Sequence, residues 1–276
     1  NKLNISFEKN LSDIKKIDSL ISIIKITIII FSAYAVIANF IPFFENGNPY
    51  FYAINAMLIG NGEFSITNQF LQETMHVEFV PENWIITDHG TAVPISGSGL
   101  AVAGSIFYLI GGYYGLFYLS PIFYIILLIA SERISTKLFG SYVGFFTLLV
   151  VASSNLLFRN SIELLTESIF SLFFIIAVFY LIKFIKTKKN YFLLVSTIVF
   201  TASTWIRING LITFPLEIFI ISTYVVFTIA FKRKSLENNI NSITKSSQNF
   251  KKFTTKKIII ISLIVAIPWL IFLTSH

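Results

Sequence analysis

The chain lacks cysteine altogether and is poor in charge. Zero Cys among 276 residues excludes disulfides, cysteine-ligated metals and a thiol nucleophile. Only 13% of the residues are charged, whereas 55% are hydrophobic, and the mean hydropathy is +0.75. Several apolar runs reach the roughly 20 residues of helix that cross a hydrocarbon core. The composition therefore predicts a helical integral membrane protein.

One long part of the chain also lacks positive charge. No lysine or arginine occurs between Lys25 and Arg133. Acidic residues gather in one part of this gap, at Glu45, Glu63, Glu73, Glu78, Glu82 and Asp88. Because Lys and Arg collect on the cytoplasmic side of membrane proteins, we expect this acidic segment to face outwards. The net charge of +7 is thus a topology signal, and the scattered basic clusters argue against a nucleic-acid partner.

The apolar runs predict an all-α, polytopic protein of the plasma membrane with a cytoplasmic N-terminus. The predicted spans are about 21–43, 114–131, 141–158, 164–182, 191–206, 209–231 and 257–273. Residues 1–20 form a cytoplasmic lead-in, and 232–257 is a basic cytoplasmic linker. The first run has no small-residue cleavage site after it, so we interpret it as a retained anchor. Since the chain opens on Asn1 and stops at His276 soon after a span, we expect a piece of a longer protein.

The apolar run at 93–112 decides how many times the chain crosses. If it crosses once, the basic loops at 133–137 and 183–189 both fall outside; if it stays outside, every basic cluster is cytoplasmic. Five glycines and three serines dilute its hydropathy. We therefore expect a large first outer loop, 44–112, that contains juxtamembrane helices and a re-entrant or membrane-lying segment. The alternative is an eighth span. The two halves of the chain lack the matching broken helices of an inverted-repeat transporter.

Two places in the outer loop carry candidate functional residues. Glu45 follows the first span and precedes an amphipathic helix at 50–59. It is either a solvated polar cap or a partly desolvated general base. Asp88 and His89 precede a Gly/Ser-rich run whose backbone could approach a ligand closely. The pair could orient an acceptor or bind metal, although adjacent side chains seldom point the same way.

A second set of charged residues is expected at the outer ends of later spans. Arg159, Glu163 and Glu167 recur at a spacing of four, which would stack them on one helical face. They would either line a wet cavity or form a structural Arg–Glu pair. Arg207 is the other basic residue expected outside, and a planar guanidinium there suits a phosphate. Glu217 lies deeper and is given no catalytic role.

Together, these residues resemble the C-type glycosyltransferases of membranes, a group that includes protein O-mannosyltransferases and the aminoarabinose transferase of lipid A. The likeness covers most of the chain in order. It rests on an outer acid followed by a Pro-Tyr-aromatic helix ending in Gly (Glu45–Gly60), a His/Gly/Pro stretch (His89–Pro94) and a Thr-Glu span start in 164–170. The stretch Thr204–Pro215 is also similar to the family's Thr-x-Arg-x-x-Gly-Leu junction, with one more residue between Thr204 and Arg207. Family members usually carry Asp after the first span, where this chain has Glu45 and then Asn48.

The resemblance implies transfer of a hexose or pentose from a dolichyl- or polyprenyl-phosphate carrier to a glycan, lipid or protein acceptor on the outer face. Glu45 would be the base that takes the acceptor proton, with inversion at the anomeric carbon. Arg207, with Arg159, would stabilise the departing lipid phosphate. A divalent metal is compatible with this chemistry, but nothing in the sequence requires one.

The competing class is a non-enzymatic membrane transporter or an assembly subunit for lipid-linked glycans. A transporter needs polar residues through the bilayer midplane. Here the ionisable residues concentrate at the outer ends of the predicted spans, and Glu217 is the one that argues the other way. The distribution favours an interfacial active site.

Overall fold

The computed structural model describes residues 2–40, 48–63, 65–67, 84–86, 91–94, 99–207, 215, 218–220 and 222. The chain divides into two compact units, Asn1–Leu172 and Phe173–His276, and each is described by itself. Most of the described residues are helical, as the sequence predicted. Among them, three helices are long and apolar enough to cross a membrane, and one bent pair of helices would make a fourth. The structure thus has the helical, apolar character of a membrane protein.

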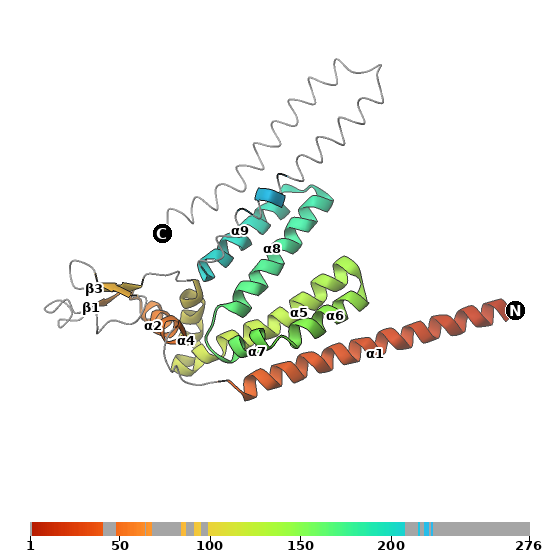
Figure 1. The fold of residues 1–276 in the computed structure, drawn as a ribbon, viewed down its shortest axis with the longest axis horizontal. Helices are drawn as coiled ribbons and strands as arrows, with labels where there is room; N and C mark the ends of the chain where they lie inside the picture. The colour runs from red at the N-terminus through yellow and green to blue at the C-terminus, as the bar shows by residue number, and fades with distance from the viewer. Residues whose placement is uncertain are drawn as a thin grey trace, which may run out of the picture. The chain divides into compact units, whose positions relative to one another are not determined.

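The first unit combines helices with one small sheet. The helices are α1 (Lys2–Ala38), α2 (Asn48–Gly60), α4 (Gly99–Phe117), α5 (Leu119–Phe139), α6 (Ser141–Ala152) and α7 (Asn155–Ile162), followed by the start of α8 (Glu167–Thr187) (Figure 1). The strands β1 (Ile66–Thr67), β2 (Trp84–Ile86) and β3 (Thr91–Pro94) pair antiparallel in the order β1-β3-β2. The mostly helical structure agrees with the expected all-α class. The small sheet was not predicted, because strands this short show no readable alternation in the sequence.

Helices α1 and α5 pack antiparallel, and three contacts define their register. The Phe40 ring lies 5.4 Å from the Tyr118 ring, between centroids, just before α5 begins. Val36 and Tyr124 share a buried cluster, and Lys25 Nζ lies 2.7 Å from Glu132 Oε1. The first residues of α5 therefore lie at the carboxyl end of α1, and the Glu132 part of α5 returns to the level of Lys25.

Helix α4 does not run straight. Gly112 has φ 60° and ψ −152°, a conformation that interrupts the helix. Beyond it the chain turns back, since a Cβ on Gly115 would meet the carbonyl oxygen of Phe107, and one on Gly104 would lie 3.5 Å from Leu116 Cδ2. In a straight helix, residues 104 and 116 would be about 18 Å apart. Length and composition alone make α4 a candidate span, but its backbone reverses within it.

The predicted span 141–158 is broken into two helices. Helices α6 and α7 meet at an angle of 57°. The break falls at Ser153 and Ser154, and the Ser154 side chain caps α7 by accepting a hydrogen bond from the Leu157 amide at 3.4 Å. Serine side chains compete with the helix for backbone partners and therefore favour caps over helix interiors. A hydropathy average does not register this break.

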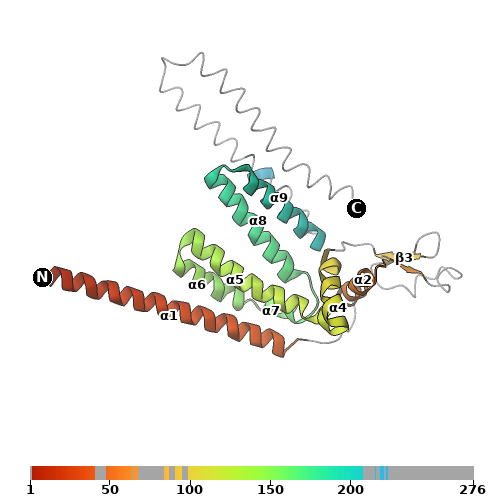
Figure 2. The same cartoon turned by 180° about the vertical axis from the view of Figure 1, so that it is seen from behind.

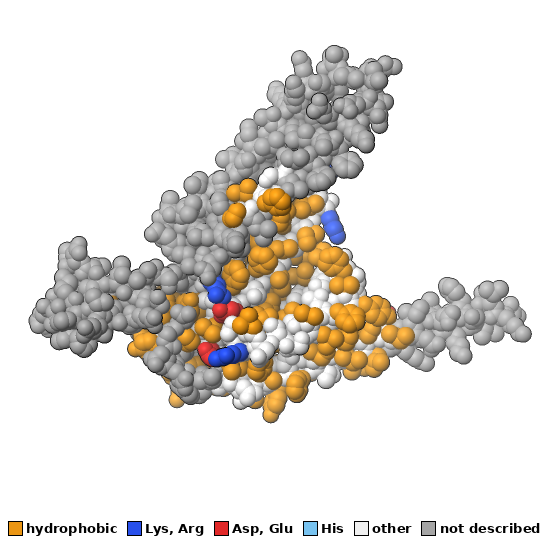
Figure 3. All heavy atoms as spheres, in the orientation of Figure 1, with side chains coloured by type: hydrophobic (Ala, Val, Ile, Leu, Met, Phe, Trp, Pro, Cys, Tyr) orange, Lys and Arg blue, Asp and Glu red, His pale blue; other side chains and the backbone are white. Residues whose placement is uncertain are grey.

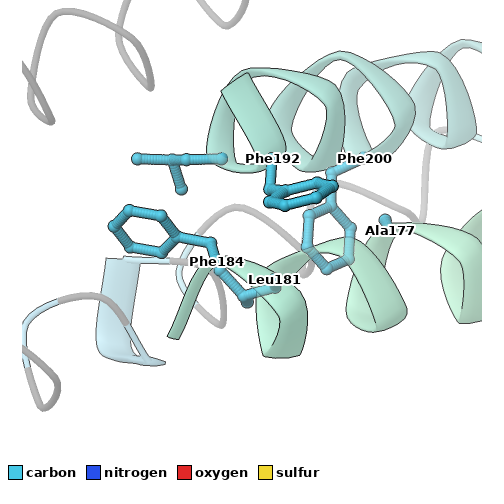
Figure 4. Packing of buried hydrophobic residues seen from close by; sticks show 6 residues of the cluster. Ala177, Leu181, Phe184, Phe192 and Phe200 are labelled. Carbon is cyan, nitrogen blue, oxygen red and sulfur yellow. The ribbon is translucent and has the colours of Figure 1, made fainter. Parts of the chain in front are cut away.

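The second unit contains the rest of α8 and α9 (Asn190–Ile206), which form an antiparallel hairpin. Phe184, Phe192 and Phe200 are buried together between the two helices (Figure 4). Ser196 Oγ donates to the Ala177 carbonyl at 2.9 Å and so ties the helices at mid-length. Near the turn of the hairpin, the Nζ atom of Lys183 lies 4.3 Å from the centroid of the Phe192 ring. The predicted span 191–206 thus exists as a helix, whereas 209–231 and 257–273 fall largely or wholly outside the described residues.

Hydrophobic side chains cover much of the described surface on the face seen in Figure 3. On α1, Phe31 and Tyr34 are 69% and 70% exposed. A soluble monomer rarely exposes large contiguous apolar patches. We expect this apolar surface to contact the acyl chains of lipids.

Candidate functional site

Three candidate residues of the first unit lie around the connection between α7 and α8, residues 163–166. Arg159 is on α7, Glu163 follows it in extended backbone (φ −114°, ψ 163°), and Glu167 is the first residue of α8. The predicted single helical face is therefore wrong, because the helix ends at Ile162 and a new one begins after Thr166. The missed signal is Thr166 itself, since Thr directly before Glu-Ser is a typical helix start.

Ser120 holds this connection from a different helix. Its hydroxyl lies 3.2 Å from both the amide nitrogen and the carbonyl oxygen of Leu165, so it can accept from one and donate to the other. Ser120 is fully buried in the first turn of α5. In an apolar setting, a chain segment between helices must find partners for its backbone polar groups. Ser120 provides a partner for each group of Leu165, and the Leu165 amide also donates to the Glu163 carbonyl at 2.9 Å.

A second pair of serines ties α7 to α8. Ser161 Oγ and Ser168 Oγ lie 2.7 Å apart, and both residues are fully buried. The side chains of Leu164 and Thr166 are also buried, at 2% and 4% exposure. The connection is therefore a fixed piece of backbone that can support charged side chains in a defined geometry.

The charged residues around the connection differ in exposure. Arg159 is exposed, whereas Glu163 and Glu167 are partly buried, and the Oε2 atom of Glu167 is enclosed by protein. Glu167 also occupies the first turn of α8, where the helix dipole favours a negative charge. The arrangement offers a guanidinium at the surface and carboxylates that are partly withdrawn from solvent.

The connection lies at the same end of the first unit as the end of α1. Phe40 contacts Tyr118, and Ser120, which holds the connection, is two residues further along. Glu45 is five residues beyond Phe40, so the chain lets it lie at most about 18 Å from Phe40. Glu45 itself lies outside the described residues, as do Asp88, His89 and Glu217.

The strands that flank Asp88 and His89 pair with each other. Ile86 of β2 is opposite Ala92 of β3, so the two candidate residues belong to the short link of this strand pair. Among the described residues, no group of three or more His, Cys, Asp or Glu side chains could hold a metal ion. That Asp88 and His89 bind a metal ion stays a prediction.

Arg207 belongs to the second unit and ends α9. It is the C-terminal cap residue, with extended backbone (φ −144°, ψ 119°), and its amide donates to the Ser203 carbonyl at 3.2 Å. Within the hairpin it lies at the opposite end from the basic turn. That turn includes the exposed residues Lys186, Lys188 and Lys189.

One polar cluster was not predicted from the sequence. Lys25 Nζ donates to Glu132 Oε1 and, at 3.2 Å, to Ser141 Oγ; Thr136 Oγ1 donates to the same carboxylate oxygen at 2.8 Å. The ion-paired side chains are only 11% and 15% exposed. The sequence does contain one signal for this cluster. Lys25 is a single lysine inside an apolar run, and a charge in such a place needs a partner. This cluster joins α1, α5 and α6 at the end of the unit away from the connection.

No family model matches this sequence, and no curated protein matches it significantly. The fold and the described residues define a helical, membrane-type protein with a charged, backbone-supported connection at one end of its first unit.

Proposed function

We propose that the chain is a membrane glycosyltransferase that moves a sugar from a polyprenyl-phosphate carrier to an acceptor on the outer face of the plasma membrane. The site would comprise Glu45 and the charged residues around the connection, with Arg207.

The observation that carries the proposal is a segregation of charge within each unit. In the first unit, Arg159, Glu163 and Glu167 lie at the end opposite the last turns of α5, which carry the exposed residues Arg133 and Lys137. In the second, Arg207 lies opposite the basic turn of the α8–α9 hairpin. Because basic clusters mark the cytoplasmic side, both sets of candidate residues are assigned to the outer side.

The same reasoning supports a seven-span topology. Helix α1 would run outwards and α5 inwards, so that Lys25 and Glu132 meet near the cytoplasmic surface. The 21 residues of α5 span about 31 Å, enough for the hydrocarbon core. The α6–α7 pair and α9 would then run outwards, α8 inwards, and two later spans would follow the hairpin.

Labelling of single cysteines tests this topology, since the chain has no native Cys. A cysteine at Thr187, which is exposed at the end of α8, should react with an impermeant thiol reagent only after the cells are opened. A cysteine at exposed Asn61, just after α2, should react in intact cells. Reaction of position 187 in intact cells would exclude the seven-span arrangement.

In the proposed step, the acceptor hydroxyl oxygen attacks the anomeric carbon of the donor sugar. Its proton passes to the Glu45 carboxylate, which acts as general base. The bond between the anomeric carbon and the phosphate oxygen breaks, and the lipid phosphate leaves with the electron pair. Guanidinium groups of Arg207 and Arg159 would stabilise the charge that develops on this phosphate.

Consumption of polyprenyl-phosphate sugars by membranes containing the chain tests the function. Glu45→Gln should lower turnover by roughly 10²–10⁴, the usual contribution of a general base, at unchanged protein level. Glu63→Gln is the matched control, because Glu63 is an exposed outer-loop carboxylate with no assigned role. Wild-type membranes that consume none of the tested donors would favour a transporter or an assembly subunit, and a fully active Glu45→Gln variant would remove Glu45 from the mechanism.

A further inference from the structure

The turn of the α8–α9 hairpin concentrates positive charge that no nearby carboxylate balances. Four lysines occur within seven residues, at Lys183, Lys186, Lys188 and Lys189. The sequence has no Asp or Glu between Glu167 and Glu217, and the described residues of the second unit include neither acid. The first unit differs, because Lys25 there is paired with Glu132. The ammonium groups of the turn therefore call for an anion from outside the described part of their unit.

Lys183 is held by aromatic rings at the level of this turn. Its Nζ atom lies 4.3 Å from the centroid of the Phe192 ring, and 5.8 and 5.9 Å from those of Phe179 and Tyr180. A cation is attracted to the face of such rings. Tyr191 next to them is 54% exposed, and tyrosines are enriched at the boundary between acyl chains and headgroups. The aromatic cluster thus indicates that the turn lies at this boundary.

The length of α8 gives the turn the same depth. Helix α8 is a candidate span, and its 21 residues measure about 31 Å, close to the thickness of a hydrocarbon core. Figures 1 and 2 show α8 and α9 side by side, joined at one end by the turn. The exposed residues Lys186, Lys188 and Lys189 occupy the last turn of α8 and the positions just beyond it. They therefore lie where the hydrocarbon ends and the headgroup phosphates begin.

Lys188 has a backbone conformation that usually selects glycine. Its φ is 59°, and among the described residues no other non-glycine residue has a positive φ. It directly follows α8, and its amide donates to the Phe184 carbonyl at 2.7 Å. Gly or Asn is the usual residue at such a helix end, because a larger side chain is sterically disfavoured there. A lysine that stands where glycine would fold more easily points to a use for its charge.

We propose that the turn is a binding site for anionic phospholipids in the leaflet where α8 ends. The ammonium groups of Lys186, Lys188 and Lys189 contact the headgroup phosphate, and Lys183 adds its charge from the aromatic cluster. The charge bias assigns this leaflet to the cytoplasmic side, whose surface anionic lipids make negative. That bias requires only basic residues beyond a span, whereas this turn has a fixed backbone at headgroup depth.

An exposed stripe on α9 selects a lipid rather than a soluble anion as the occupant. Tyr191, Leu194 and Ile198 are 54%, 40% and 50% exposed, and their spacing of three and four places them on one side of the helix. The stripe begins beside the lysines and continues along the apolar hairpin. A molecule whose phosphate meets the lysines can therefore lay its acyl chain along these side chains, which a soluble phosphate compound cannot do.

Fluorescence quenching on the full chain in phosphatidylcholine vesicles tests the proposal. A fluorophore is attached to a single cysteine at Leu194, since the chain has no native Cys. A small fixed fraction of the lipid carries brominated acyl chains, on either phosphatidylglycerol or phosphatidylcholine. We expect brominated phosphatidylglycerol to quench at a lower fraction, and we expect this preference to weaken as salt is added.

Lys188→Gly separates the charge from the fold. Glycine adopts the backbone of this position freely, so the variant should unfold thermally no earlier than Lys188→Arg, the control that keeps the charge. The preference for phosphatidylglycerol should fall about fivefold in Lys188→Gly, the usual contribution of one lysine at a membrane surface, and persist in Lys188→Arg. It should disappear when Lys186, Lys188 and Lys189 are all replaced by Gln.

Three results would overturn the proposal. The first is equal quenching of the wild-type chain by both brominated lipids. The second is a preference that survives replacement of the three lysines, because the anionic lipid would then be held elsewhere. The third is a preference that inorganic phosphate removes at constant ionic strength, because the turn would then be a site for a soluble phosphate. None of these measurements depends on sugar transfer.

Discussion

Lys25 and Glu132 are 107 residues apart in the chain, yet their side chains meet at 2.7 Å between Nζ and Oε1. The pair joins α1 to α5, and it sets the register that brings the start of α5 to the end of α1. A charged pair that is withdrawn from solvent is costly to break on one side only.

Removing both partners of this pair should therefore destabilise the protein by less than the sum of the two single losses. Lys25→Met leaves the Glu132 carboxylate with Thr136 alone, and Glu132→Gln leaves the ammonium group with Ser141. We expect the double variant to recover about 1–3 kcal/mol of the summed single losses. Denaturant unfolding of the four proteins in lipid or detergent measures this coupling. Purely additive losses would show that the two charges do not stabilise each other.

Ser120→Ala should loosen the connection without unfolding the bundle. The substitution removes both hydrogen bonds between Ser120 and Leu165 and leaves the Leu165 amide only the Glu163 carbonyl. This amide should then exchange with solvent faster. Ser131→Ala is the matched control on α5, because Ser131 is also buried but bonds only to Leu128 of its own helix. Hydrogen exchange of the peptide covering 163–168, followed by mass spectrometry, distinguishes the two. Equal exchange in both variants would mean that Ser120 does not hold the connection.

Gly112→Ala should cost more stability than Gly111→Ala. Gly112 has φ +60° with ψ −152°, whereas Gly111 shows no such backbone, and an added Cβ would meet nothing within 4 Å at either position. The difference is therefore backbone strain alone, about 1–3 kcal/mol for a non-glycine residue in this region. Thermal unfolding of the two variants compares them. Equal stability would contradict the reversal in α4.

Substitutions at Arg207 should give a graded loss of donor use. Lys keeps the charge but lacks the two-pronged geometry that a guanidinium offers a phosphate, so Arg207→Lys should raise the donor requirement moderately and Arg207→Ala severely. Folding should stay intact in both variants, as judged by thermal unfolding. If Arg207→Ala instead lowers stability while the surviving protein uses donor normally, Arg207 supports the fold and does not bind the phosphate.

Hydropathy predicted several helices because apolar runs of sufficient length must be helical in a bilayer. Residues 21–43 fall largely on α1 and residues 191–206 on α9, and 164–182 on α8 apart from its start. The prediction was wrong where one helical face was expected for Arg159, Glu163 and Glu167. Thr166 starts a new helix there, and Ser120 on another helix satisfies the backbone between them. A contact across 45 residues leaves no periodic trace in the chain.

The sequence by itself determined the class of this protein and, through its basic clusters, an expected side for each candidate residue. The class and the expected sides can be obtained from the sequence because each is a sum over residues. The first sums the hydropathy of each apolar run, and the second counts the lysines and arginines on either side of it. Only the tertiary structure decided that α4 reverses at Gly112, that Lys25 finds Glu132, and that Ser120 supports the connection beside Glu163 and Glu167. Those features depend on which surfaces meet, and close packing between helices, with the hydrogen bonds it permits, is a pairwise property that no single stretch of sequence encodes.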